Sequence, residues 1–308
     1  MRRFLAVVAM GVGSGCHHSL TVGVPAKPIA WISFRWVTAI LDGGPLERAT
    51  LVLDSRPILP ETNSLLQLDL AGSGNRPVGF PFNSGAPAAG MLRTRGRFYG
   101  LIDQVGGRYR LPGPSSDSVE IDAAGREIGT VGLPYFERRV LLLDYPRNRL
   151  AVLPDSEPVS PGLAARARFT QVVLDTSRVL ISLRLGDEML RRVELDPALT
   201  PFPIWTTPDR WRAVTGRRED EPGNRIYRFH SPGGELTFVG APAATPVTLG
   251  SVDLGRPEVV FLREGPAAAR LENWPDPTDA VVGNRLFADR FLLVLDLPKR
   301  RLGLVDSR

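Results

Sequence analysis

An internal repeat constrains the fold of this chain more than any other feature of its sequence. Residues 131–150 read VGLPYFERRVLLLDYPRNRL, and residues 282–302 read VGNRLFADRFLLVLDLPKRRL. Val-Gly, Phe, Arg and Asp-x-Pro recur in the same order, and one extra residue in the second copy keeps Asp144 aligned with Asp296. Because a repeated sequence can bury the same faces in the same way, this pattern predicts two similar halves.

Each copy of the repeat predicts a β-hairpin with a polar, basic tip. An apolar run ends in Asp-x-Pro and basic residues, and a second apolar run follows at residues 150–153 and 302–305. Proline has no backbone N–H and a fixed φ, so it ends a strand and begins a tight turn. We therefore expect Asp144 and Asp296 to be structural residues of these turns.

Composition favours short strands over long helices. The chain has 308 residues, of which 43% are apolar, so it can bury a sizeable core. Its 31 glycines and 28 prolines favour many strands joined by turns. Residues 208–215 could form a short helix, with Thr207 as N-cap and Pro208 at the first helical position. A weaker similarity relates residues 50–56 (TLVLDSR) to residues 171–178 (QVVLDTSR).

The first 15 residues have the layout of a signal peptide. Arg2 and Arg3 form a positive start, residues 4–12 are apolar, and the small residues 13–15 precede Cys16. A lone cysteine after small residues resembles a bacterial lipoprotein signal. That resemblance implies secretion across the inner membrane, acylation of Cys16, and a place in the cell envelope with membrane contact through the lipid anchor only. Simple secretion and an unprocessed N-terminus are the alternatives.

The remaining chain divides into a tether and two lobes. We place the tether at residues 16–27, lobe one at 28–157 and lobe two at 158–308. Residues 156–162 read SEPVSPG, a composition typical of a linker.

Several classes of function are disfavoured by composition. The net charge is +5, but the arginines are scattered among acidic residues, whereas a nucleic-acid surface would concentrate them in a stripe. The single cysteine excludes an internal disulfide. The three histidines do not have metal-ligand spacing, and no phosphate-binding loop is present, so we expect neither a metal nor a cofactor.

The two copies resemble pepsin-like and retropepsin-like aspartic peptidases. The resemblance rests on residues 279–287 in lobe two and 129–136 in lobe one, where two apolar residues and Gly are followed by Phe, an apolar strand and Asp with a basic turn. It implies an all-β, bilobal, pepsin-like fold with duplicated six-stranded acid-protease barrel lobes and few short helices.

The same resemblance implies one catalytic Asp in each lobe, at the end of an apolar strand. Asp69, in LQLDLAGS, and Asp196, in VELDPALT, match these positions. Both loops differ from the family's Asp-Thr/Ser-Gly. Leu70 and Pro197 replace the hydroxyl residue, and Ala replaces the glycine. Ser73 and Thr200, four residues after each Asp, are candidates to supply the missing hydroxyls.

Two further sets of residues complete the candidates. Tyr99 and Tyr109 lie 30 and 40 residues beyond Asp69 and are candidates for the family's flap tyrosine, or ordinary half-buried strand tyrosines. Asp54 and Asp175 form an alternative catalytic pair. The residues that follow them resemble Asp-Thr/Ser-Gly more closely, but both aspartates come early in their lobes. The simpler interpretation is that they are ordinary turn aspartates.

Two hypotheses for function follow. The first is an aspartic endopeptidase that cleaves extended peptides in the cleft between the lobes. The second is a catalytically degenerate lipoprotein of the same fold that binds a peptide or an envelope protein. An envelope protein with no cleft ligand is a lesser third alternative.

Overall fold

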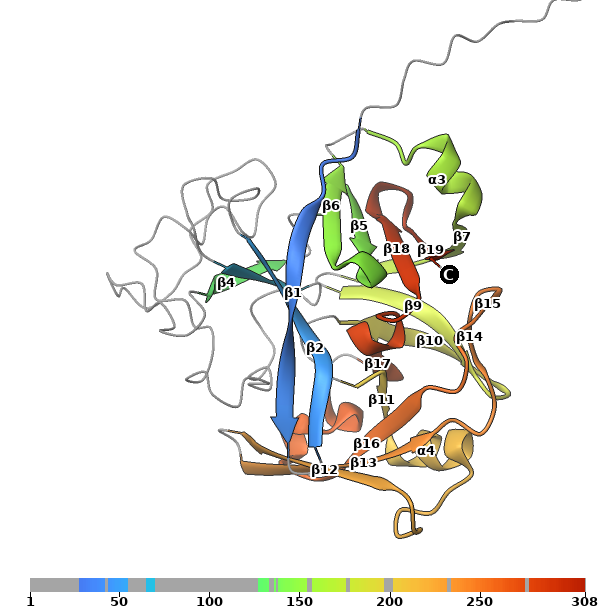
Figure 1. The fold of residues 1–308 in the computed structure, drawn as a ribbon. Coiled ribbons are helices and arrows are strands. Elements are labelled where there is room, and N and C mark those ends of the chain that lie inside the picture. The colour runs from blue at the N-terminus through green and yellow to red at the C-terminus, as the bar shows by residue number, and fades with distance from the viewer. Residues whose placement is uncertain are drawn as a thin grey trace, which may run out of the picture.

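The computed structural model describes residues 28–41, 44–54, 65–69, 127–132, 136, 138–153, 157–175, 178–196, 202–231, 234–274 and 277–307. Between residues 35 and 132 the description concerns the backbone, apart from the side chain of Leu51. Figure 1 shows the arrangement of the elements.

The described part of the first half is built from strands. They are β1 (Ile32–Leu41), β2 (Gly44–Asp54), β3 (Leu65–Asp69), β4 (Glu127–Gly132), β5 (Val140–Asp144) and β6 (Arg149–Leu153), with the 3-10 helix η1 (Tyr145–Arg147) between β5 and β6.

The second half adds further strands and two short α-helices. Its strands are β7 (Arg168–Gln171), β8 (Val173–Asp175), β9 (Arg178–Leu185), β10 (Glu188–Leu195), β11 (Ile204–Thr206), β12 (Arg225–Ser231), β13 (Gly234–Pro242), β14 (Val247–Leu249), β15 (Val252–Asp253), β16 (Glu258–Glu264), β17 (Ala280–Val282), β18 (Phe291–Asp296) and β19 (Arg301–Asp306). Its helices are α3 (Pro161–Arg166), α4 (Pro208–Thr215), η2 (Ala267–Ala269), η3 (Leu271–Asn273), η4 (Asn284–Leu286) and η5 (Leu297–Lys299).

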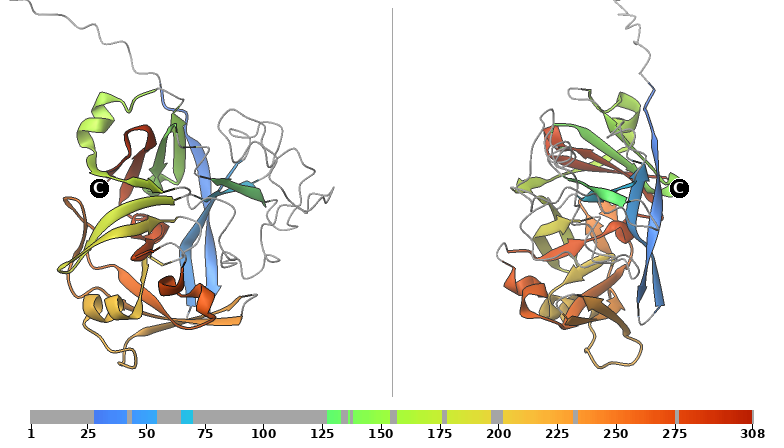
Figure 2. Two further views of the ribbon diagram at one scale, coloured as in Figure 1. Left: turned by 180° about the vertical axis from the view of Figure 1, so that it is seen from behind. Right: turned by 90° about the vertical axis from the view of Figure 1, so that its left-hand side faces the viewer.

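The strands form two sheets. One runs in the order β4-β3-β2-β1-β6-β5-β18-β19-β7, so it contains strands from both halves of the chain. The other runs β12-β13-β16-β11-β17-β10-β9-β14-β15 and belongs to the second half, with β8 paired to β9. In Figures 1 and 2 the two hairpins β5–β6 and β18–β19 lie side by side.

The middle of the shared sheet has an approximate two-fold symmetry. Strands β5 and β18 are antiparallel, with Leu142 opposite Val294, Asp144 opposite Leu292 and Asp296 opposite Val140. On the outer side, the N–H of Phe34 donates to the carbonyl of Asn148, and the N–H of Val172 donates to the carbonyl of Arg300, both at 2.9 Å. The repeat in the sequence is therefore a repeat in space.

The hairpin prediction is confirmed in both copies. Asp144 accepts a hydrogen bond from Arg149 at 2.8 Å, and Asp296 accepts one from Arg301 at 2.9 Å. Both aspartates are buried, so they close the turns as structural residues. The arginines also stack on aromatic rings that flank the hairpins: Arg149 lies 4.1 Å from the ring centre of Trp31, and Arg301 lies 4.0 Å from that of Phe169.

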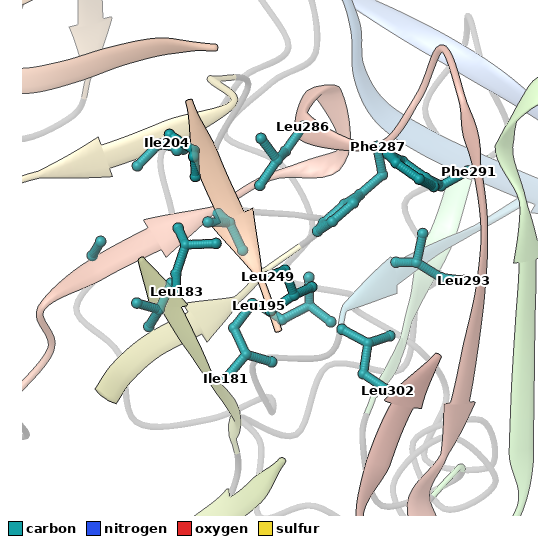
Figure 3. Close-up of a cluster of buried hydrophobic side chains, with 14 of the residues drawn as sticks. Ile181, Leu183, Leu195, Ile204, Leu249, Leu286, Phe287, Phe291, Leu293 and Leu302 are labelled. Carbon is teal, nitrogen blue, oxygen red and sulfur yellow. The ribbon is translucent and has the colours of Figure 1, made fainter. Parts of the chain in front are cut away.

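The apolar runs of β5 and β18 are continuous because the shared sheet is covered on both faces. Every residue of the two strands is buried. Leu141 and Leu293 pack in the large core, whereas Leu142 and Val294 pack in a smaller cluster on the other face. Figure 3 shows that the large core continues from Leu293 of the shared sheet to Leu195 of lobe two. A strand buried on both faces reads as an unbroken apolar run instead of an alternating one.

The fold class predicted from the sequence is confirmed for the described residues in that they form a two-lobed, all-β fold with few short helices. The predicted helix at residues 208–215 is present as α4, with Pro208 at its first position and Gly216 ending it at φ 65°, although Thr207 makes no side-chain cap. No helix in the described ranges has the length and apolar character that a membrane crossing requires.

Candidate active site

The two candidate aspartates end strands with the same neighbours in each lobe. In lobe one, β3 is antiparallel to β2 and parallel to β4. In lobe two, β10 is antiparallel to β9 and parallel to β17. Both lobes therefore contain a strand that lies between one antiparallel and one parallel partner. Asp69 ends this strand in lobe one, and Asp196 follows it directly in lobe two.

The register of these strands also agrees between the lobes. Leu68 pairs with Val131 and Asp69 with Gly132 in lobe one. In lobe two Leu195 pairs with Val282, and the N–H of Asp196 donates to the carbonyl of Val282 at 2.9 Å. Asp196 is thus one residue further along, beside Gly283, as Asp69 is beside Gly132.

Asp196 is completely buried, and so is Glu194 two residues before it. Val193 and Leu195 pack in the large core. Because side chains alternate along a strand, Glu194 and Asp196 leave the opposite face together. The carboxyl groups of Asp196 and Glu194 therefore both lie in a water-excluded environment on the same face of the strand.

Arg178 is the cation of this region. Its side chain is 4% exposed, and its Nη1 lies 4.0 Å from Oε2 of Glu194. The guanidinium also donates to Thr278 at 3.1 Å and to Asp175 at 2.7 Å. Sequence reasoning missed Arg178 and Glu194. The sequence does contain a signal for Glu194, because this charged residue interrupts the apolar run two positions before Asp196.

A hydrogen bond joins the two lobes beside Asp196. The hydroxyl of Tyr145, in the lobe-one hairpin, donates to Oδ1 of Asn284 at 2.6 Å. Asn284 follows Gly283 directly, begins η4 and is buried. Burial raises the pKa of Tyr145 well above its ordinary value near 10, so this hydroxyl keeps its proton. The loop next to Asp196 is therefore attached to lobe one.

The alternative aspartates do not occupy equivalent positions. Asp54 ends β2, the antiparallel neighbour of β3. The equivalent strand in lobe two is β9, the antiparallel neighbour of β10. Asp175 ends β8 and forms a hairpin with Arg178, to which it is ion-paired. The similarity of residues 50–56 to 171–178 is thus wrong as a guide to equivalent strands. The two segments have similar residues, but they belong to strands with different pairing partners.

The other candidates lie outside the described residues: Cys16, Ser73, Tyr99, Tyr109 and Thr200, together with residues 1–27. The same holds for the side chain of Asp69, whose backbone alone is described. Within the described ranges no group of three or more His, Cys, Asp or Glu side chains is placed to hold a metal ion.

No protein-family model matches the chain, and no curated protein matches it. Among solved structures, an aspartic proteinase from Irpex lacteus is similar at 13% identity and TM-score 0.42, over 91% of this chain and 97% of that one. Basic 7S globulin from soybean is similar at 11% identity and TM-score 0.37, over 91% and 97%. Conglutin gamma from lupine seeds is similar at 11% identity and TM-score 0.41, over 92% and 96%.

Proposed function

We propose that this chain is an aspartic-type endopeptidase in which Asp69 and Asp196 act together on an extended peptide held between the lobes. The observation that supports the proposal is the common register: Asp69 lies level with Gly132, and Asp196 lies beside Gly283 in the same pairing of strands. The proposal requires that the equivalent strand ends of the two lobes face each other across one seam, and their equal pairing supports this.

The proposed chemistry needs two carboxyl groups of unequal protonation. Carboxyls about 3 Å apart cannot both ionise, so they share one proton. The ionised member takes a proton from water, and the protonated member donates to the carbonyl oxygen of the peptide. The burial of Asp196 favours this arrangement, because a carboxyl in a water-excluded site holds its proton more readily.

The test is hydrolysis of an unfolded protein from acid to neutral pH, with and without pepstatin. Asp69→Asn and Asp196→Asn should each lower kcat/KM by at least about a hundredfold, the usual range for losing a general acid or base. Asp187→Asn is the matched control, since Asp187 is exposed in the turn that feeds β10. Activity that persists in the Asp69→Asn, Asp196→Asn double variant would rule out this function.

A second candidate function is peptide binding without hydrolysis, and the sequence after each Asp favours it. Leu70 and Pro197 provide no side-chain hydroxyl, and Pro197 also lacks a backbone N–H that could stabilise a carboxylate. Fluorescence anisotropy with labelled unfolded peptides would then show saturable binding that pepstatin displaces, with no cleavage. Cleavage that disappears in either single Asp variant excludes this candidate.

We also propose that the protein acts in the cell envelope, anchored through Cys16. The positive start, the short apolar stretch and the small residues before Cys16 support this location. Mass spectrometry of the mature N-terminus would find an acylated Cys16, and an intact Met1 would contradict the proposal.

A further inference from the structure

Strand β10, which leads to Asp196, contributes Glu194 to a buried ion pair with Arg178. A pair of catalytic aspartates does not require such an ion pair. Glu194 is fully buried, and its partner Arg178 is 3% exposed. Glu194 precedes Asp196 by two residues on one extended strand, a separation of roughly 7 Å along the backbone. Burying such a pair is costly unless it is well compensated, so its position beside a candidate catalytic residue calls for a role.

The charged groups that contact β10 and Arg178 come from several elements. Arg178 begins β9, Asp175 ends β8, and Arg192 lies earlier on β10. Asp175 is shared between Arg178 at 2.7 Å and Arg192 at 3.3 Å. On the loop before β17, Asp279 accepts hydrogen bonds from the N–H groups of residues 191 and 192 and pairs with Arg210. Among the described residues, Glu194 is the carboxyl that shares the strand face of Asp196.

Arg178 favours the ionised form of Glu194, because its Nη1 lies 4.0 Å from Oε2 of that carboxyl group. A guanidinium keeps its charge at every relevant pH, and a neighbouring cation favours the charged form of a carboxyl. Arg178 is also hydrogen-bonded to Asp175 and Thr278, which fixes the guanidinium on that side of β9. A negative charge at Glu194 disfavours a second one at Asp196.

We propose that Glu194, held by Arg178, is a positioning residue that keeps the proton on Asp196, so that Asp196 is the acid of the pair. The inference rests on the proposed function, which makes Asp69 and Asp196 the catalytic pair. Lobe one differs at the same register position: Gln67, two residues before Asp69, cannot carry a charge. The two lobes thus differ in charge at this register position, and in the proposal Asp69 is the base.

The resulting hydrolysis balances without any further reactant. Asp69 takes a proton from water as the water oxygen bonds to the peptide carbon, and the carbonyl electron pair moves to oxygen, which takes the proton of Asp196. The C–N bond then breaks, the proton on Asp69 passes to the leaving nitrogen, and the proton of one hydroxyl returns to Asp196. The products are a carboxylic acid and an amine.

Glu194→Gln tests the proposal by removing one charge with little change of shape. The upper limb of the pH profile of kcat/KM should move by about 1 unit toward acid, because Asp196 then loses its proton more easily. Glu194→Asp should restore the wild-type profile. Glu188→Gln is the matched control: the same change on the same strand, at a side chain that is 46% exposed. Identical profiles for Glu194→Gln and wild type would overturn the proposal.

An infrared titration of the full chain separates this inference from the proposed function, because it needs no substrate. The absorption of a protonated carboxyl should persist toward neutral pH in the wild type, be missing in Asp196→Asn, and disappear about 1 unit lower in Glu194→Gln. If that absorption remains in Asp196→Asn, the proton is elsewhere and the inference is wrong, whatever the peptidase assay shows. If Glu194→Gln does not fold, the comparison of wild type with Asp196→Asn still decides whether Asp196 holds the proton that the inference requires. A protein without peptidase activity that titrates as expected would refute the function alone.

Discussion

At the scale of single residues, the contact between Tyr145 and Asn284 is the clearest departure from the repeat. In the alignment of the two copies, Tyr145 corresponds to Leu297 and Asn284 to Leu133. Each copy therefore has one polar residue where the other has a leucine: Tyr145 in the first copy and Asn284 in the second. The polar pair crosses from lobe one to the loop beside Asp196, with an oxygen–oxygen distance of 2.6 Å.

Replacing Tyr145 with Phe should lower the free energy of unfolding by about 1–2 kcal/mol, since a buried hydrogen bond is lost while the ring remains. Urea denaturation would measure the loss. A double-mutant cycle with Asn284→Leu should show coupling between the two positions. Additive losses would mean that the hydrogen bond contributes nothing of its own.

The same variant should change the response to alkaline pH. The pKa of Tyr145 is raised in the folded state, so the unfolded chain loses this proton first as the pH passes about 10. The stabilisation is fully present below that pH and decreases above it, by about 1.4 kcal/mol per pH unit. The difference in stability between wild type and Tyr145→Phe should therefore shrink with rising pH, and a constant difference would contradict the assignment.

At the scale of elements, the two hairpins agree down to their backbone angles. Asp144 has φ −89° and ψ 79°, and Asp296 has φ −88° and ψ 76°. Each turn ends in a left-handed residue, Asn148 at φ 49° and Arg300 at φ 48°. Asn tolerates this conformation through its short polar side chain, whereas a long side chain is strained there.

Arg300→Gly should therefore stabilise the protein, by about 0.5–1 kcal/mol, because glycine removes the left-handed strain and Arg300 is exposed. Asn148→Gly should have a smaller effect. Lys299→Gly is the control, since Lys299 is exposed in the adjacent right-handed turn and glycine there should bring no gain. Thermal unfolding of the three variants provides the measurement. A loss of stability in Arg300→Gly would show that its side chain makes an unrecognised contribution.

At the scale of the whole molecule, the shared sheet couples the lobes. Leu142 pairs with Val294 at the approximate two-fold axis, and both are completely buried. Strands from both lobes continue outward from this pair, so neither lobe can lose its inner hairpin without exposing the other.

Leu142→Ala should destabilise both lobes by about 2–5 kcal/mol, the usual cost of a large-to-small change in a core. Trp205 and Trp211 are buried in lobe two and report its unfolding by fluorescence. Their transition should move to lower urea together with the loss of secondary structure. Val173→Ala, at a lobe-two side chain that is 58% exposed, should leave it unchanged. A fluorescence transition that stays in place in Leu142→Ala would show that the lobes unfold independently.

The sequence by itself determined the features that depend on neighbours along the chain. The Asp-x-Pro turns and the helix of α4 both follow from residues a few positions apart, because proline, glycine and strand-end aspartates act locally. Repetition of these local signals was sufficient to predict two lobes and an all-β fold.

Only the tertiary structure decided which distant residues meet. Arg178 and Glu194 are 16 positions apart and come together across two strands, and Tyr145 reaches Asn284 across 139 positions. The resemblance of Asp54 to Asp175 failed for the same reason, since equivalence depends on which strands pair. A single sequence records which residues can be buried or charged, whereas the chain's path through two sheets determines which of them share one buried space.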